Sequence, residues 1–114
     1  MKYTLDAQNK KIGRVASEAA KLLMGKNSTT YVRNAAPQVT VEIVNAAKAD
    51  ISTKRKETVL KARYSQYPGG LKSETIGHVI EKKGVAEVFR KAVDGMLPRN
   101  KLRAKMIKNL KISE

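Results

Sequence analysis

The sequence predicts an α/β domain in which helices flank a small, largely parallel sheet, with a basic helical arm at the C-terminal end. Residues 3–7 and 39–44 are typical of strands, and three stretches with apolar residues at helical spacing are interleaved with them or follow them. With 114 residues, the chain has the length of one domain with a modest core, and it shows no internal repeat or linker. We therefore expect residues 1–114 to form a single domain, in which residues 97–114 are the arm.

The first strand leads through a polar loop into the first predicted helix. Gly25 follows this helix as the expected stop, because glycine adopts the left-handed conformation at low cost. The apolar face of the helix consists of Ile12, Val15, Ala16, Ala19, Leu22 and Leu23. Residues 39–44 alternate apolar and polar side chains, which predicts the second strand. Residues 48–63 predict a basic loop leading into a third strand, and Pro68-Gly69-Gly70 predicts the loop that ends it.

Two amphipathic helices are predicted next. The shorter one has Ser73 as its candidate N-cap and Gly84 as its stop. Its inward-facing residues are Ile76, Val79 and Ile80. The longer one has apolar residues at every expected position of a helical stripe. These are Val85, Val88, Phe89, Ala92, Val93 and Met96.

A hinge and a closing helix are predicted at the end of the chain. We expect Gly95 in a left-handed C-terminal position and Pro98 in the first turn of the closing helix. One face of that helix would carry Leu102, Met106, Ile107 and Leu110. The other would carry Lys101, Lys105, Lys108 and Lys111, with Arg99 and Arg103 near the boundary. A solvated helix normally mixes both signs of charge, so this row favours contact with a polyanion over a merely solvated face.

The charge balance also indicates a polyanionic partner. Lys and Arg number 24 against 10 Asp and Glu, which gives a formal net charge of +14. Such an excess repels itself in a compact protein and is usually neutralised by a polyanion, so nucleic acid is the first candidate partner and an anionic membrane the second. No apolar run could span a bilayer, and no signal peptide is evident. The absence of cysteine suits a reducing, intracellular location and excludes disulfides and thiol chemistry.

Enzymatic chemistry has little support in the sequence. His78 faces away from the apolar stripe of its helix, so we interpret it as a solvated residue rather than a catalytic base. The acidic residues are scattered, and Gly25-Lys26 lacks the rest of a phosphate-binding loop and follows a helix instead of preceding one. We therefore expect no catalytic residue, metal site, cofactor or small-molecule substrate. A small phosphate-handling enzyme that uses the helix end near Gly13 is a weaker hypothesis than a protein that binds RNA without catalysis.

Two stretches are the main candidates for RNA contact outside the closing segment. At the start of the first helix, free N–H groups together with Lys10, Lys11 and Arg14 could hold a phosphate, with plain helix capping as an equally supported alternative. Tyr64 and Tyr67 could stack on unpaired bases, and Gly69 and Gly70 could let the backbone approach ribose or phosphate. Composition alone favours an ordinary turn whose tyrosines pack on a helix. The remaining candidates are Lys26, Arg33, Lys54, Arg55, Lys56, Arg63 and Lys72.

A set of motifs resembles the large-subunit ribosomal protein L-thirteen (L13) family of bacterial type. In order, they are Tyr3…Asp6-Ala7, Ile12-Gly13-Arg14-Val15-Ala16, Gly25-Lys26, Val44-Asn45-Ala46, Tyr67-Pro68-Gly69-Gly70-Leu71-Lys72 and Ala92-Val93…Gly95-Met96-Leu97-Pro98…Asn100. The likeness covers nearly the whole chain, and the Tyr-Pro-Gly-Gly and Gly-Met-Leu-Pro blocks are its most specific parts. Residues 36–39, 52–55, 64–66 and 103–104 depart from the family pattern, and the chain is shorter at its C-terminus than most bacterial members, which indicates a divergent lineage.

The resemblance implies a three-layer α/β/α domain and a non-enzymatic function. On this basis the protein would be a structural constituent of the cytoplasmic ribosome that binds large-subunit ribosomal RNA early in assembly, beside neighbouring large-subunit proteins. The alternative hypothesis is a free RNA-binding regulator that acts on messenger RNA outside the ribosome.

Overall fold

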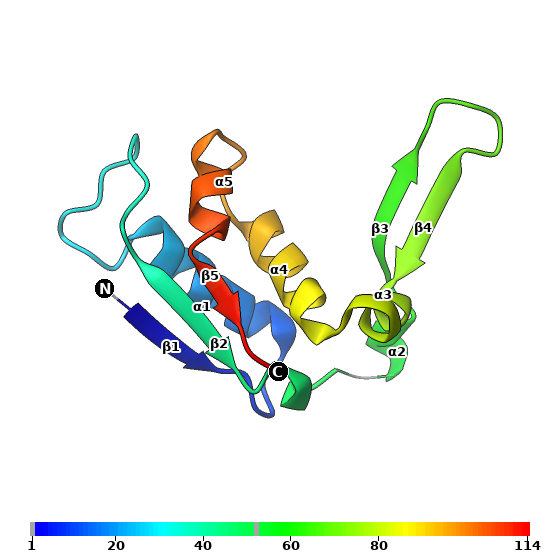
Figure 1. Ribbon diagram of the computed structural model, residues 1–114, viewed down its shortest axis with the longest axis horizontal. Coiled ribbons are helices and arrows are strands. Elements are labelled where there is room, and N and C mark those ends of the chain that lie inside the picture. Colours follow the sequence, from blue (N-terminus) through cyan, green and yellow to red (C-terminus); the bar gives the residue numbers. More distant parts are fainter. Residues whose placement is uncertain (1, 52) are drawn as a thin grey trace.

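The computed structural model describes residues 2–51 and 53–114, without the side chains of Arg55 and Lys61. Helices pack on a three-stranded sheet, and a long hairpin projects from this body (Figure 1). The elements in chain order are β1 (Lys2–Asp6), α1 (Ile12–Met24), β2 (Thr40–Val44), η1 (Ala46–Lys48), α2 (Thr53–Lys56), β3 (Val59–Tyr64), β4 (Leu71–Thr75), α3 (Ile76–Lys83), α4 (Val85–Met96), α5 (Leu102–Ile107) and β5 (Leu110–Ile112). The predicted α/β class is confirmed.

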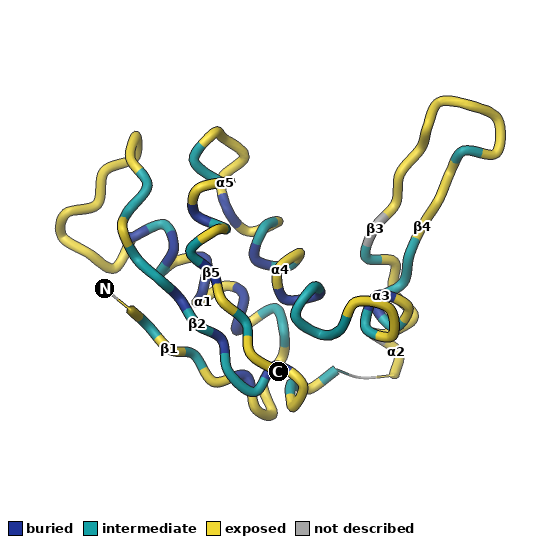
Figure 2. The backbone as a smooth tube through the Cα atoms, in the orientation of Figure 1, coloured by how far each residue is buried: buried dark blue, intermediate teal, exposed yellow. Residues whose placement is uncertain are grey.

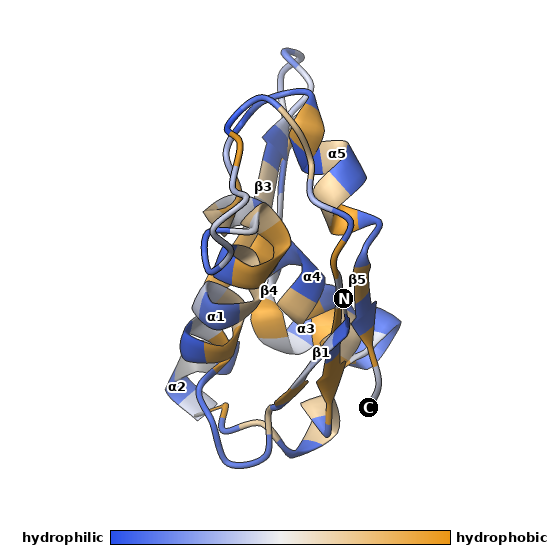
Figure 3. Ribbon diagram, turned by 90° about the vertical axis from the view of Figure 1, so that its left-hand side faces the viewer, coloured by the Kyte–Doolittle hydropathy of each residue, from blue (hydrophilic) through white to orange (hydrophobic). Residues whose placement is uncertain are grey.

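The central sheet is parallel and has the order β1-β2-β5. Val41 and Ile43 of the middle strand are fully buried, because alternate side chains of a strand point to one face and this face is covered by α1 and α4. Figure 3, turned by 90°, places the sheet on one side of the molecule and α1 on the other. The largely parallel sheet predicted from the sequence is therefore confirmed.

The opposite face of the sheet is polar. Lys2, Thr4 and Asp6 of β1 and Lys111 of β5 are exposed there. Among the described residues no helix covers this face, so the outer helical layer implied by the family resemblance is not present in them. Strand sequences that alternate polar and apolar residues fit a sheet with one solvated face, whereas strands covered on both faces are continuously apolar.

The core is divided into two hydrophobic clusters that share α4. Phe89 and Val93 belong to the main cluster between the helices and the sheet, and Val88 belongs to a smaller cluster with Ile76 and Val79 at the base of the hairpin. Figure 2 shows buried positions along α1, α4 and β2, while the hairpin is almost entirely exposed beyond its base. The hairpin therefore depends on α3 and α4 for its attachment to the body.

The end of the chain differs from the predicted closing helix. Helix α5 ends at Ile107, and residues 110–112 form the strand β5, which pairs with β2. The amide of Val41 donates to the carbonyl of Asn109 at 3.0 Å, and the amide of Ser113 donates to the carbonyl of Ile43 at 2.8 Å. Short helices are marginal by themselves, so burying Leu110 in a sheet outweighs one more helical turn. The prediction that the closing helix includes Leu110 and Lys111 is therefore wrong.

The predicted hinge is also wrong. Gly95 lies inside α4 and is not among the residues with positive φ, and the helix ends at the buried, extended Leu97. Pro98 does not open α5, which begins at Leu102, whose amide donates to the Oδ1 atom of Asn100 at 3.0 Å. The amide of Leu97 donates to the carbonyl of Val93 at 3.1 Å, so the helical hydrogen bonding continues past the glycine.

The third predicted strand exists, but it does not join the main sheet. Strand β3 pairs antiparallel with β4 in a separate two-stranded sheet. The sequence suggested Ser73 as the N-cap of α3, but this residue lies in β4. Thr75 caps that helix instead, because its Oγ1 atom accepts a hydrogen bond from the amide of His78 at 3.3 Å.

Two glycine substitutions test these backbone assignments. Gly25 ends α1 at a φ of 76°, and a Cβ atom added there would lie 3.1 Å from Cγ of Pro37. Gly25→Ala should therefore lower the free energy of unfolding by about 1–2 kcal/mol. Gly95→Ala should raise it by up to about 1 kcal/mol, because alanine is favoured over glycine inside a helix and no atom lies within 4 Å of the added Cβ. Urea unfolding of both variants measures the difference, and equal midpoints would contradict the assignment.

Asp6 predicts an acid-dependent contribution to stability. Its Oδ1 atom accepts hydrogen bonds from the amide of Gln8 at 2.9 Å and from Nδ2 of Asn45 at 3.1 Å, so it links the ends of β1 and β2. These hydrogen bonds, backbone first, and the charges of Lys10 and Lys48 lower the pKa of Asp6 below its ordinary value of 3.8. A lowered pKa gives stabilisation that is present above the ordinary pKa and is lost as the pH falls through the folded-state value.

We therefore expect Asp6→Asn to be less stable than the parent at neutral pH. The difference should shrink as the pH falls below the ordinary pKa of 3.8 towards the lower value of the folded state. Urea midpoints of both proteins measured across this pH range provide the test. A difference that stays constant down to the most acidic sample would show that the carboxylate charge does not contribute.

Candidate RNA interface

The tip of the β3–β4 hairpin is an exposed part of the predicted interface. Tyr64 and Leu71 are paired across the two strands, and Tyr67 lies in the turn between them. Tyr64 is 60% exposed, Tyr67 74% and Leu71 70%. The alternative interpretation, in which the tyrosines pack on a helix, is therefore wrong. Both tyrosines are therefore accessible to a partner.

The turn at the tip depends on its glycines. Gly69 has a φ of 74°, a backbone conformation that is strained for any residue with a side chain. Gly70 donates its N–H to the carbonyl of Tyr67 at 2.9 Å. A Cβ atom at Gly70 would overlap Oγ of Ser65 and lie 2.9 Å from the carbonyl oxygen of Tyr67. Both glycines are therefore required by the turn itself, which presents the two tyrosines.

A groove of about 930 Å³ separates the hairpin from α3 and α4. Arg63 and Lys72, both predicted from the sequence, line the hairpin side of this groove. Lys82, Lys83 and Lys91 line the opposite side, and the sequence did not single them out. A pattern in the sequence could not join these lysines to the hairpin, because they lie on two different helices that meet the hairpin only in the folded chain.

The predicted phosphate site at the start of α1 is partly assembled. Lys10, Lys11 and Arg14 are exposed around a cavity of about 440 Å³, and no side chain caps the helix. However, Nζ of Lys11 lies 2.6 Å from Oδ2 of Asp50, and both residues line the same cavity. The carboxylate neutralises one of the three cations, which weakens this site for an anion. Capping of the helix by its own side chains is not seen.

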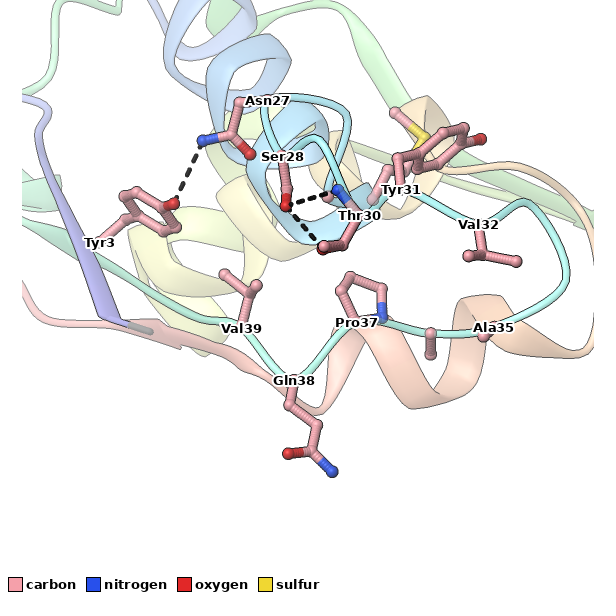
Figure 4. Close-up of a pocket in the computed structure, with 13 residues that line it drawn as sticks. Tyr3, Asn27, Ser28, Thr30, Tyr31, Val32, Ala35, Pro37, Gln38 and Val39 are labelled. Carbon is pink, nitrogen blue, oxygen red and sulfur yellow. Dashed lines mark hydrogen bonds between the residues drawn. The ribbon is translucent and has the colours of Figure 1, made fainter.

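The loop after α1 carries Lys26 and Arg33, which are both exposed and line a hollow of about 320 Å³. Figure 4 shows the neighbouring pocket, about 260 Å³, where Nδ2 of Asn27 donates to Oη of Tyr3 at 3.2 Å. Tyr31 lines both hollows and is 44% exposed. Tyr31 is not among the residues predicted from the sequence, although its position between Lys26 and Arg33 resembles the combination of aromatic and basic residues in the hairpin.

The cations of the closing segment do not all lie on one helix. Arg103 is half-buried, and its Nε lies 3.4 Å from Oδ1 of Asp94 on α4. Lys111 lies on β5 in register with Glu42, on the open face of the sheet. Lys2 lies 2.8 Å from the Glu42 carboxylate and, mainly through this hydrogen bond, lowers its pKa. The predicted row of four lysines therefore loses Lys111 to β5, whereas Lys101, Lys105 and Lys108 are exposed along α5 and at its two ends. Arg99 and Lys111 are the other exposed cations of this segment.

Three further predicted cations lie on or near α2. Lys54 and Lys56 are exposed, and the side chain of Arg55 lies outside the described residues.

In the described part of the chain, histidine and acidic side chains do not gather into a group that could hold a metal ion. None of the helices in that part is long and apolar enough to cross a membrane.

Comparisons with known proteins identify the family. The family model for ribosomal protein L13 matches residues 1–114. The large ribosomal subunit protein uL13 of Carboxydothermus hydrogenoformans is 44% identical over 110 residues, which are 96% of this chain and 76% of that protein. The uL13 proteins of Geobacter sp. strain M21 and Acaryochloris marina are 43% and 36% identical, again over 96% of this chain and over 77% and 72% of theirs. The chain therefore belongs to the ribosomal protein L13 family.

Proposed function

We propose that the protein is a structural component of the large ribosomal subunit and binds large-subunit ribosomal RNA through the β3–β4 hairpin. The observation that carries this proposal is the exposure of Tyr64 and Tyr67 at the tip of a basic hairpin. Exposed tyrosines between Arg63 and Lys72 can stack on unpaired bases while the cations neutralise nearby phosphates. The relatives, which are large ribosomal subunit proteins, support the same assignment.

The net charge of +14 supports contact over more than one surface. We infer that cations elsewhere on the body add phosphate contacts that position the protein without distinguishing sequences. These secondary contacts involve Lys10, Lys11, Arg14, Lys26, Arg33, Lys54, Lys56, Arg99, Lys101, Lys105, Lys108 and Lys111. Arg103 is a weaker candidate, because Asp94 already engages it. Arg55 is also proposed as a phosphate contact, on the basis of its sequence position alone.

The proposed role is non-catalytic and needs no cofactor. It includes binding early in subunit assembly, when few other proteins cover the RNA, and contact with neighbouring ribosomal proteins. The apolar positions left exposed on the body, such as Val32 and Met96, are available for such contacts.

Replacing both hairpin tyrosines separates stacking from charge. The double variant Tyr64→Ala, Tyr67→Ala should lose about 1–3 kcal/mol of binding free energy for each base that stacks. The slope of log affinity against log salt should stay the same, because no charge is removed. Affinity for a large-subunit RNA fragment, measured at several salt concentrations, provides the test.

The matched control is Tyr64→Phe, Tyr67→Phe, which keeps both rings and should bind like the parent. Parent-like affinity of the alanine variant would mean that the hairpin tip does not contact the RNA. Sedimentation with large subunits through high salt tests the ribosomal assignment. Protein that binds the RNA fragment but leaves the subunits under these conditions would act outside the ribosome.

A further inference from the structure

The groove between the hairpin and helices α3 and α4 combines cations from four elements. Arg63 on β3 and Lys72 on β4 form one side, and Lys82, Lys83 and Lys91 from the two helices form the other. All five side chains are exposed, and Glu74 is the single acidic residue among the described residues that line the groove. A concave surface with one sign of charge concentrates counter-ions and attracts an anionic partner.

The pairing of the hairpin strands strengthens the case for an anion in the groove. The register places Arg63 directly opposite Lys72, so two cations are neighbours on the same face of the hairpin. Like charges in this position destabilise a strand pair. The lysines at the end of α3 have a local explanation, because cations stabilise the C-terminal end of a helix. The Arg63–Lys72 pair has no such explanation, and a bound anion between the two strands would supply one.

The rest of the lining indicates which form of RNA would fit. Sequence-tolerant binding of single strands relies on a series of aromatic rings on which successive bases stack. Tyr64 and Tyr67 do not line the groove, and His78 contributes the one ring among its described residues. Double-stranded RNA is instead recognised through its phosphates and 2′-hydroxyl groups, which need cations and hydrogen-bond donors but no stacking platform.

We propose that this groove holds the phosphate backbone of a double-stranded RNA segment, while the hairpin tip contacts unpaired nucleotides. The proposal rests on the ribosomal RNA binding proposed above and adds the form of RNA and the residues that take it. Lys82, Lys83 and Lys91 become contact residues that the sequence did not indicate. The two surfaces are adjacent, so a stem and its loop can be bound together.

The triple variant Lys82→Gln, Lys83→Gln, Lys91→Gln tests the groove. Glutamine has nearly the helix propensity of lysine, so α3 and α4 should remain folded. The probe is a blunt RNA duplex of roughly 16 base pairs without loops, the length spanned by double-stranded RNA-binding domains. Each lost phosphate contact makes the slope of log affinity against log salt shallower by about 0.9 units, so the variant should lose roughly two to three units.

A matched control removes the same charge from other surfaces. Lys2→Gln, Lys21→Gln, Lys48→Gln also removes three exposed lysines, none of which lines the groove. Its slope with the duplex should change by less than about one unit. Equal losses in the two triple variants would mean that net charge alone matters, and this would overturn the proposal. An unchanged slope in the groove variant, or a parent protein that does not bind the duplex, would overturn it as well.

The large-subunit RNA fragment separates the two proposals. If the groove variant binds this fragment like the parent while the tyrosine-to-alanine variant loses it, ribosomal RNA binding stands and the groove assignment fails. If the parent protein does not bind the fragment at all, the proposed function itself fails. The circular dichroism spectrum of each variant confirms that the fold is intact before binding is compared.

Discussion

Helix α4 holds the body and the base of the hairpin together. Its buried face belongs to both hydrophobic clusters, since Phe89 and Val93 lie in the main core and Val88 packs with Ile76 and Val79. Each such side chain contributes about 1.5–3 kcal/mol when fully buried. An isolated two-stranded hairpin is at best marginally stable in water. The direction in which β3 and β4 project is therefore set by the contact of α3 with α4, and this contact also forms one side of the basic groove.

The placement of charge follows from this division of the core. Among the described residues no polar or charged residue is buried, so their cations all lie at the surface. The body retains compensating acids, such as Asp94 beside Arg103 and Asp50 beside Lys11. Among the described residues that line the groove, five are cations and Glu74 alone offsets them. Repulsion among these cations lowers the stability of the free protein. Because bound RNA phosphates would neutralise the cations, RNA binding should stabilise the hairpin.

Local patterns predicted the elements with long apolar stripes, and pairing between distant segments accounts for the errors. Helices α1 and α4 and strands β1 and β2 follow from periodicity, and Gly25 was correctly predicted as the end of α1. Strand β5 has three residues, too few for a period to show, and forms because β2 offers an open edge. The exposure of Tyr64 and Tyr67 could not be predicted, because nothing in residues 59–75 shows that the hairpin leaves the body. The groove brings together lysines that share no local pattern.

We propose that RNA is bound mainly by the hairpin and the adjacent groove, while the closing segment adds only secondary phosphate contacts. Amide chemical shifts of the labelled protein, recorded with and without a large-subunit RNA fragment, test it most directly. We expect the largest changes at residues 63–72 and around Lys82, Lys83 and Lys91, with β1 and η1 almost unchanged. Changes concentrated at residues 99–111, with the hairpin unaffected, would contradict it.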